Sequence, residues 1–218
     1  MKNYCLLKIV LDRLGSYVFN QELEICSTLQ LIKTENNINY LDYMLQYENI
    51  GFKVKYMSKD NIEKERQACN VYTDAKFIVH THPLSEHPYP SVEDIWMLVN
   101  HTNIKLSVIA TSWGIYTLKQ KEEFKNNDWL KAVENRNYVE GFKGWLGGEL
   151  DFIGMIEYKK KEKEKKKEKN NDENKDEINY KLTFVEYRDI NLILNNISNK
   201  MDIEIRLYPW NFIIFSPT

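Results

Sequence analysis

Two histidines and an aspartate near the middle of the chain have the types and the spacing of metal ligands. His80 and His82 are separated by one residue and follow a short apolar run, residues 77–79, that is typical of a buried strand. Side chains two residues apart in a strand point to the same face, so the two imidazoles are expected to face the same way. Asp94 follows at the predicted start of a helix, where backbone N–H groups favour a carboxylate. Side chains of this kind bind catalytic zinc with three protein ligands and leave the fourth position to water.

The same segment resembles a known motif. Residues 80–83 read His-Thr-His-Pro, and residues 91–94 read Ser-Val-Glu-Asp. This arrangement is similar to the signature of the JAMM metalloproteases, the catalytic branch of the MPN-domain family, in which His-[Ser/Thr]-His-Pro is followed by Ser-x-x-Asp. Eight residues, 83–90, separate the second histidine from the serine, whereas the family usually has seven; a loop absorbs one added residue at small cost. The Pro-Tyr-Pro-Ser run that ends the loop also resembles the RadC-like branch.

The resemblance implies zinc as the cofactor, with three protein ligands: His80, His82 and Asp94. It also implies that Ser91 donates a hydrogen bond to the oxyanion that develops during hydrolysis. Ser91 and Asp94 have, in addition, the spacing of a helix-capping box, which is common in ordinary helices and is compatible with metal binding. The two remaining histidines, His87 and His101, lack neighbours of the metal-ligand type, so we expect them to have loop or surface roles.

A catalytic glutamate is implied upstream, in a strand predicted over residues 21–29. The family places it there, often as Glu-x-x-Gly, and Glu24 is the closest match because residues 24–27 read Glu-Ile-Cys-Ser. Glu22 is the alternative, since it lies two residues earlier and would share a strand face with Glu24. Both glutamates would otherwise be solvent-facing residues of an edge strand. The implied role is that of a general base that takes the proton of the attacking water and returns it to the leaving amine.

The function that the resemblance implies is zinc-dependent hydrolysis of isopeptide or peptide bonds, with ubiquitin or a ubiquitin-like protein as the substrate partner. Other subunits of a protein complex are further expected partners. Two alternatives stay open: a non-catalytic MPN-like scaffold or interaction module, and a RadC-like nucleic-acid-associated protein. A formal net charge of −2 argues against a dedicated nucleic-acid surface.

Composition and cysteine usage indicate a globular protein of a reducing compartment. Hydrophobic residues make up 43% of the chain, which is enough for a substantial core. Three scattered cysteines, Cys5, Cys26 and Cys69, fit a reducing compartment better than a disulfide framework. The first residues lack the pattern of a signal peptide, and no apolar run approaches the ~20 residues of a membrane span. We therefore expect a cytoplasmic or nuclear protein without a membrane partner.

Hydrophobic periodicity and turn residues predict an α/β fold with a central β-sheet flanked by helices. The resemblance implies that this sheet is MPN/JAB-like. The predicted helices are residues 4–18, 58–71, 94–100 and 189–200, with further helices within 115–148. The predicted strands are residues 21–29, 38–45, 52–57, the run into His80, 105–110, 152–156, 180–185 and 203–207.

The expected organisation is a single domain with one charged insertion. Residues 1–158 form the catalytic core in this interpretation, and residues 178–218 complete it with a strand, a helix and a strand. Residues 159–177 are almost entirely Lys, Glu, Asn and Asp, so they are expected to form a largely disordered insert between two strands. The apolar end, residues 210–215, is expected to dock on the core.

Overall fold

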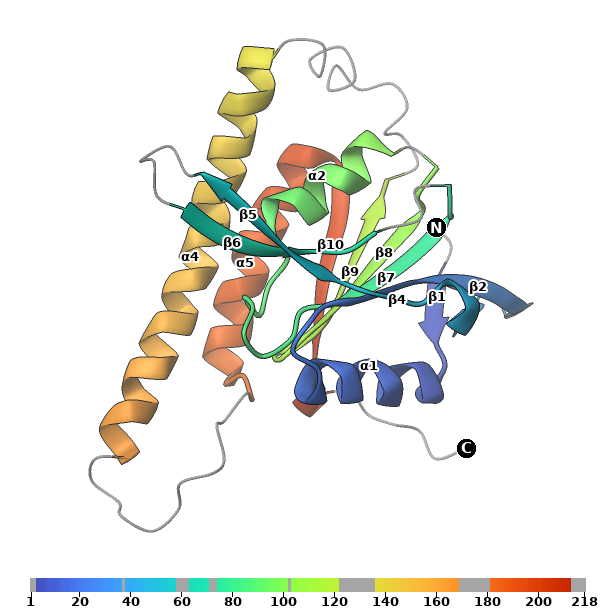
Figure 1. The fold of residues 1–218 in the computed structure, drawn as a ribbon, viewed down its shortest axis with the longest axis horizontal. Coiled ribbons are helices and arrows are strands. Elements are labelled where there is room, and N and C mark those ends of the chain that lie inside the picture. Colours follow the sequence, from blue (N-terminus) through green and yellow to red (C-terminus); the bar gives the residue numbers. More distant parts are fainter. Residues whose placement is uncertain are drawn as a thin grey trace.

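The computed structural model describes residues 3–36, 38–57, 63–70, 74–101, 103–121, 136–168 and 181–212 (Figure 1). In chain order the elements are β1 (Asn3–Leu6), α1 (Lys8–Asn20), β2 (Ile25–Glu35), β3 (Ile38–Tyr43), the 3-10 helix η1 (Leu45–Tyr47), β4 (Asn49–Ile50), β5 (Phe52–Met57), β6 (Glu63–Ala68), β7 (Phe77–Thr81), α2 (Val92–Asn100), β8 (Leu106–Thr111), β9 (Gly114–Gln120), α4 (Arg136–Glu168), α5 (Phe184–Met201), β10 (Ile203–Pro209) and the 3-10 helix η3 (Trp210–Phe212).

A mixed, curled sheet forms the centre of a single α/β domain, which confirms the predicted fold class. Its strands follow the order β1-β3-β2-β7-β8-β9-β10, and β4 pairs with β2 beside this path. The pairs β1–β3 and β7–β8 are parallel, and the other pairs are antiparallel. Strands β5 and β6 form a separate two-stranded hairpin. The strand that carries His80 therefore lies in the middle of the sheet, between β2 and β8.

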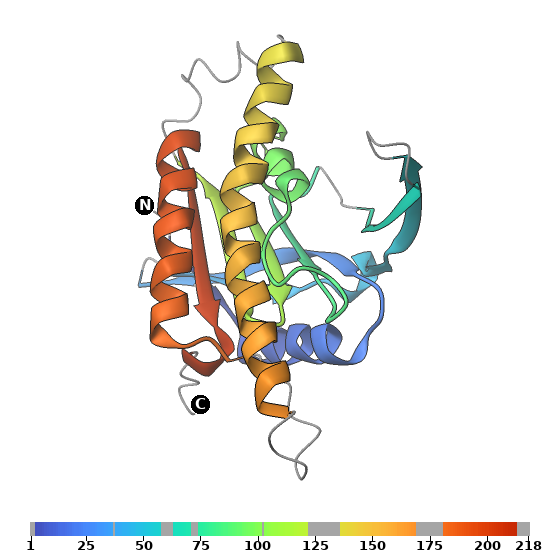
Figure 2. The ribbon, with the colours of Figure 1, turned by 90° about the vertical axis from the view of Figure 1, so that its left-hand side faces the viewer.

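The helices cover both faces of this sheet. On one face α1 buries its apolar side against β2, β3, β7 and β8. On the other face α2, α4 and α5 pack over the sheet, and α4 and α5 lie side by side (Figure 2). Strand β7 contributes to both cores, because Ile78 faces the core of α2, α4 and α5, whereas Val79 faces that of α1. This alternation places His80, two residues after Ile78, on the side of α2.

Several predicted elements are confirmed with shifted ends. The first helix begins at Lys8 rather than at residue 4, because residues 3–6 form β1 beside β3. Strand β2 begins at Ile25, later than predicted, and continues to Glu35. Strands β3, β5, β8 and β10 and helices α2 and α5 match predicted elements. At the C-terminal end the Trp210 side chain packs against the α1 core, as predicted, and donates a hydrogen bond to the Thr111 carbonyl at 2.8 Å; residues 213–215 lie outside the described part.

The helix predicted over residues 58–71 is wrong, because residues 63–68 form β6. Lysines occupy alternate positions of β5 and glutamates alternate positions of β6, and they meet diagonally across the hairpin as the ion pairs Lys53–Glu65 at 3.1 Å and Lys55–Glu63 at 2.7 Å. Opposite charges on neighbouring positions of paired strands stabilise a hairpin, although the same residues are also good helix formers. Part of the region predicted as helices, residues 115–148, is also a strand, since residues 114–120 form β9.

The charged segment does not join two strands. Residues 152–156 lie inside α4, which continues to Glu168. Of the strand predicted over residues 180–185, residues 181–183 form no strand and residues 184–185 begin α5, while residue 180 lies outside the described part. The expected disorder is therefore wrong for residues 159–168, while residues 169–177 lie outside the described part. Lysine and glutamate favour helices, and the pair Glu157–Lys161 has the i,i+4 spacing that stabilises them. None of the described helices combines the length and the apolar character needed to cross a bilayer.

Candidate metal centre

His80 belongs to the candidate centre and is the second-to-last residue of β7. It pairs with Cys26 of β2 on one side and Ile109 of β8 on the other, so its backbone is fixed by both neighbouring strands. The imidazole is 4% exposed. Its Nδ1 atom is buried and has no hydrogen-bond partner among the described residues. The polar contacts of this ring are therefore made by Nε2, which faces His82 and Asp94.

His82 lies one residue beyond β7 and is held by the loop that follows. Its backbone N–H donates to the carbonyl of Ala110 at 2.7 Å. Its ring Nδ1 lies 3.0 Å from the carbonyl oxygen of His87. A carbonyl only accepts, so Nδ1 carries a proton in this hydrogen bond. This contact orients the ring and turns Nε2 toward His80, which is how a second contact usually prepares a histidine to bind a metal.

Ser91 and Asp94 form a complete capping box at the start of α2. The Ser91 hydroxyl oxygen accepts from the Asp94 backbone N–H at 3.1 Å, and the Ser91 backbone N–H donates to Asp94 Oδ2 at 2.7 Å. The Ser91 hydroxyl also donates to Asp94 Oδ2 at 2.8 Å. The capping interpretation is thus confirmed, and the serine holds the carboxylate in place. Its hydroxyl proton is engaged by Asp94 in this structure, rather than free for an oxyanion.

The three predicted ligands converge on one point. His80 Nε2 lies 3.2 Å from His82 Nε2 and 3.1 Å from Asp94 Oδ1. His82 Nε2 lies 3.3 Å from Asp94 Oδ2. Ligand atoms at about 2.0–2.1 Å from a tetrahedral zinc are about 3.3 Å apart. The donor set and its spacing therefore fit a metal ion of this size, and these side chains form a buried group that could hold one.

The charges of this group depend strongly on one another. Burial would raise the pKa of Asp94, but the charges and hydrogen bonds of His80 and His82 hold it well below its usual range. Burial would lower the pKa of His82, but Asp94, with a smaller contribution from Glu24, raises it to about 9. Without a metal the site thus favours a protonated His82 beside an ionised Asp94. A divalent cation would take the place of that proton.

Glu24 lies beside this group, immediately before β2. The register pairs Cys26 with His80 and Ser27 with Val79, and its extension by two residues places Glu24 opposite His82. The side chain is partly buried. Burial raises the pKa of its carboxyl; the two imidazoles oppose this rise, and Asp94 adds to it. The register and these charge effects both indicate that Glu24 lies beside the three candidate ligands.

Glu22, the alternative glutamate, is exposed and lies in a bend before β2. The prediction that Glu22 and Glu24 share a strand face is wrong, because the strand begins only at Ile25. Of the two, Glu24 is the residue that the structure places near the histidines.

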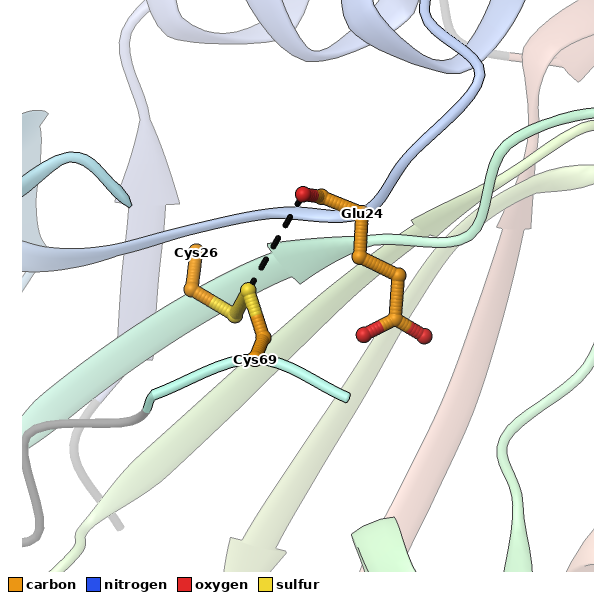
Figure 3. Close-up of side chains that lie close together, drawn as sticks. All are labelled: Glu24, Cys26 and Cys69. Atoms are coloured by element: carbon orange, nitrogen blue, oxygen red, sulfur yellow. Dashed lines mark hydrogen bonds between the residues drawn. A yellow bond between two sulfur atoms is a disulfide. The ribbon is translucent and has the colours of Figure 1, made fainter. Parts of the chain in front are cut away.

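A disulfide joins Cys26 to Cys69, which corrects the expectation of unpaired cysteines (Figure 3). The two residues are 43 positions apart, so sequence spacing gave no sign of their pairing. Cys69 Sγ lies 4.0 Å from the carbonyl oxygen of Glu24, a contact drawn as the dashed line in Figure 3. Glu24, Cys26 and Cys69 also lie close enough together to hold a metal, but both sulfurs are occupied by their mutual bond. Cys5 is free and exposed.

The loop between His82 and Ser91 is anchored at several points. The buried Thr111 hydroxyl donates to the carbonyl of Pro88 at 3.1 Å. Tyr89 is buried against α4, where its hydroxyl would lie 2.8 Å from a Cβ added at Gly154, so a larger residue there would displace this hydroxyl. These contacts fix the loop despite its added residue.

The two remaining histidines keep loop and surface positions, as predicted. The His87 ring stacks on Tyr89 and lies 4.0 Å from Glu157 of α4, while its carbonyl orients His82 as described above. His101 ends α2. Within the described ranges, neither histidine belongs to a group of metal-ligand side chains.

No protein-family model matches this chain, and no curated protein matches its sequence. The assignment of the candidate centre therefore depends on the residues of this chain and on their geometry.

Proposed function

We propose that this protein is a zinc-dependent hydrolase that cleaves isopeptide or peptide bonds, as JAMM metalloproteases do. The observation that carries the proposal is the convergence of His80, His82 and Asp94, with ligand atoms 3.1–3.3 Å apart, beside a partly buried glutamate. A strand end and a helix start supply the three ligands, in the order that the motif resemblance implies. A scaffold without chemistry has no need of a glutamate at this place.

In this proposal zinc is held by the two imidazole Nε2 atoms and the Asp94 carboxylate. Bound zinc acts as a Lewis acid and lowers the pKa of a water molecule to roughly 7. Glu24 accepts a proton from the attacking water and returns it to the leaving amine. Burial raises the pKa of the Glu24 carboxyl, which favours proton uptake by this group over that of an exposed glutamate.

Ser91 has two roles in the proposal. In the resting site it holds the Asp94 carboxylate through the hydrogen bond from its hydroxyl. During hydrolysis the same hydroxyl turns to the developing oxyanion, where one donor contributes about 10²–10³ in rate. The backbone N–H of Ser91 still donates to Asp94 during this change, so the ligand keeps one of its supports.

The proposed substrate is a conjugate of ubiquitin or of a ubiquitin-like protein, and other subunits of a complex are proposed partners. This part comes from the motif resemblance. The proposed location is the cytoplasm or the nucleus, where such conjugates occur. In these compartments thiol reductants keep most cysteines reduced, so the Cys26–Cys69 bond would be exposed to reduction there.

The test combines metal analysis with a cleavage assay on one preparation. The purified protein should contain about one zinc ion per chain and should cleave ubiquitin dimers of at least one lysine linkage. A chelator should abolish cleavage, and added zinc should restore it. His101→Ala is the matched control, because this histidine lies at the end of α2, away from the centre. Zinc-loaded protein that cleaves none of the ubiquitin dimers, nor linear ubiquitin fusions, would contradict the proposed activity.

A further inference from the structure

The β5–β6 hairpin stands apart from the main sheet and yet touches the catalytic glutamate of the proposed mechanism. In Figure 2 the hairpin lies on the side of the molecule opposite α5. Among its side chains that the structure describes, none belongs to either hydrophobic core, and its ion-paired lysines and glutamates are exposed. Its two ends, at Gly51 and at Cys69, return to the start of β2. The described contacts between the hairpin and the main sheet include several to Glu24 and its neighbours.

Hydrogen bonds from the hairpin occupy both backbone polar groups of Glu24. The Glu24 N–H donates to the side-chain oxygen of Gln67 at 2.8 Å, and the Gly51 N–H donates to the Glu24 carbonyl at 2.7 Å. The Gln67 amide also donates to the carbonyl of Glu22 at 3.0 Å, so one side chain spans the segment. A Cβ at Gly51 would lie 3.0 Å from the Ala68 carbonyl and 3.1 Å from Glu24, so the approach is close.

A covalent bond supports the same segment two residues after Glu24. The Cys26–Cys69 disulfide joins β2, two residues after Glu24, to the residue that follows β6. Cys26 is 1% exposed and pairs in the sheet with His80, a candidate zinc ligand. The disulfide thus ties the end of the hairpin to β2, which begins directly after Glu24 and pairs with the strand that carries His80.

We propose that Gln67 is a positioning residue for Glu24 and that the Cys26–Cys69 disulfide holds Gln67 in place, so that the β5–β6 hairpin sets the catalytic rate from outside the metal centre. The inference rests on the proposed function, in which Glu24 moves the proton. A thiol reductant would supply two electrons and two protons to the disulfide and leave two thiols. Turnover would then fall, while zinc stays bound, because no zinc ligand belongs to the hairpin. A displacement of about 1 Å in a catalytic group costs up to about 10²-fold in rate.

The experiment is a double-mutant cycle in a Cys5→Ser background, which leaves one pair of cysteines. Gln67→Ala, Cys69→Ser and the double variant are compared by kcat and KM on a cleaved ubiquitin dimer, by zinc content and by hydrogen exchange at the Glu24 amide. Each single change should lower kcat at least ~10-fold, with KM and zinc content unchanged. The double variant should lose less than the product of the two losses, because both changes act on one segment. Glu65→Gln, which breaks only the exposed pair with Lys53, is the matched control on β6.

Two further readouts keep the outcome clear. A thiol reductant should reproduce the loss in the background protein and have no effect on Cys69→Ser. Gln67→Glu keeps the acceptor for the Glu24 N–H but loses the donor to Glu22, and it should give an intermediate rate. Unchanged kcat in both single variants, or loss of zinc on reduction, would overturn the inference.

Failure of the proposed function can be told apart from failure of this inference. If zinc-loaded background protein cleaves no ubiquitin dimer, the function fails, and exchange at the Glu24 amide still tests the hairpin. Faster exchange at this amide in Gln67→Ala and after reduction supports the positioning role. Unchanged exchange in both would overturn it.

Discussion

His82 donates its Nδ1 proton to the carbonyl of His87, five residues later, at 3.0 Å. This contact fixes which nitrogen of His82 faces the centre, and it uses the backbone of His87 rather than its exposed ring. The loop between the two ligand-bearing elements therefore takes part in the centre through a main-chain atom. A sequence motif specifies side chains, so it does not include this main-chain contact.

The first prediction concerns the metal ligands. His82→Ala and Asp94→Ala should each reduce zinc from about one ion per chain to a small fraction, because each removes one of three converging donors. Elemental analysis after gel filtration measures this. The control is His101→Ala, which should keep full zinc. Full occupancy in both ligand variants would refute the assignment.

The second prediction concerns the proton carrier. Glu24→Gln should keep the fold and the zinc and should lose hydrolysis, because glutamine has nearly the same shape but cannot accept and return the proton. Glu22→Gln should keep most activity, since Glu22 is exposed and lies in the bend before β2. Cleavage of a ubiquitin dimer by the two variants is compared at equal zinc content. The opposite ranking would make Glu22 the acid–base residue.

The third prediction separates capping from metal support by means of two similar helix starts. Ser91 caps α2 and Thr183 caps α5, each with a complete capping box. Alanine at either position should lower the free energy of unfolding of the metal-free protein by about 1 kcal/mol. Only Ser91→Ala also removes a hydrogen bond to Asp94, so it alone should weaken zinc affinity, by roughly 10–100-fold.

Urea unfolding of metal-free samples and zinc titration against a competing chelator measure the two quantities. Equal zinc affinities for Ser91→Ala and Thr183→Ala would show that the serine only caps its helix.

The fourth prediction concerns pH. The pKa of His82 is raised to about 9 in the metal-free site, so this ring carries a proton at neutral pH, and zinc must displace it. Below this pKa, the proton competes with zinc for His82 Nε2. The apparent zinc affinity should therefore rise roughly tenfold per pH unit up to that range. Calorimetric titrations in buffers of different ionisation enthalpy should report about one proton released at pH 7. An affinity that is constant from pH 6 to pH 8 would contradict this.

The grouping of His80, His82 and Asp94 could be predicted from sequence because its parts are local. His80 and His82 share a strand face by the two-residue period, and Asp94 starts the next helix, so neither placement requires knowledge of distant pairing. The choice of Glu24 over Glu22 depended on where β2 begins, and the ends of elements are the least certain part of such a prediction. The β2–β7 register, which only the structure supplies, decides it.

The support around Glu24 could not be predicted, because two of its residues, Gln67 and Cys69, are 43 and 45 positions away. Gln67 lies in the polar stretch, residues 58–71, for which the sequence predicts a helix, and the lysines and glutamates of this stretch are good helix formers. Cross-strand ion pairs, invisible without the partner strand, make it a hairpin instead. The charged run after residue 158 is a second difference, because a largely disordered insert is predicted and residues 159–168 belong to α4. Its composition suggests solvated chain, but Lys160 lies against Glu186 of α5 at 3.6 Å and is partly buried.

The three candidate ligands all belong to one β-strand–helix–β-strand unit, β7–α2–β8, whereas Glu24 lies just before β2, the strand on the other flank of β7. In the proposed function, metal binding and proton transfer would therefore be encoded in two separate pieces of chain, which the β2–β7 pairing brings together at the candidate centre. Drift in the first piece would remove both capacities together. Drift in the second would leave a metal-loaded protein that no longer turns over. Loss of activity in a descendant of this chain is thus separable from loss of its metal, and the zinc content of an inactive variant tells which of the two pieces has failed.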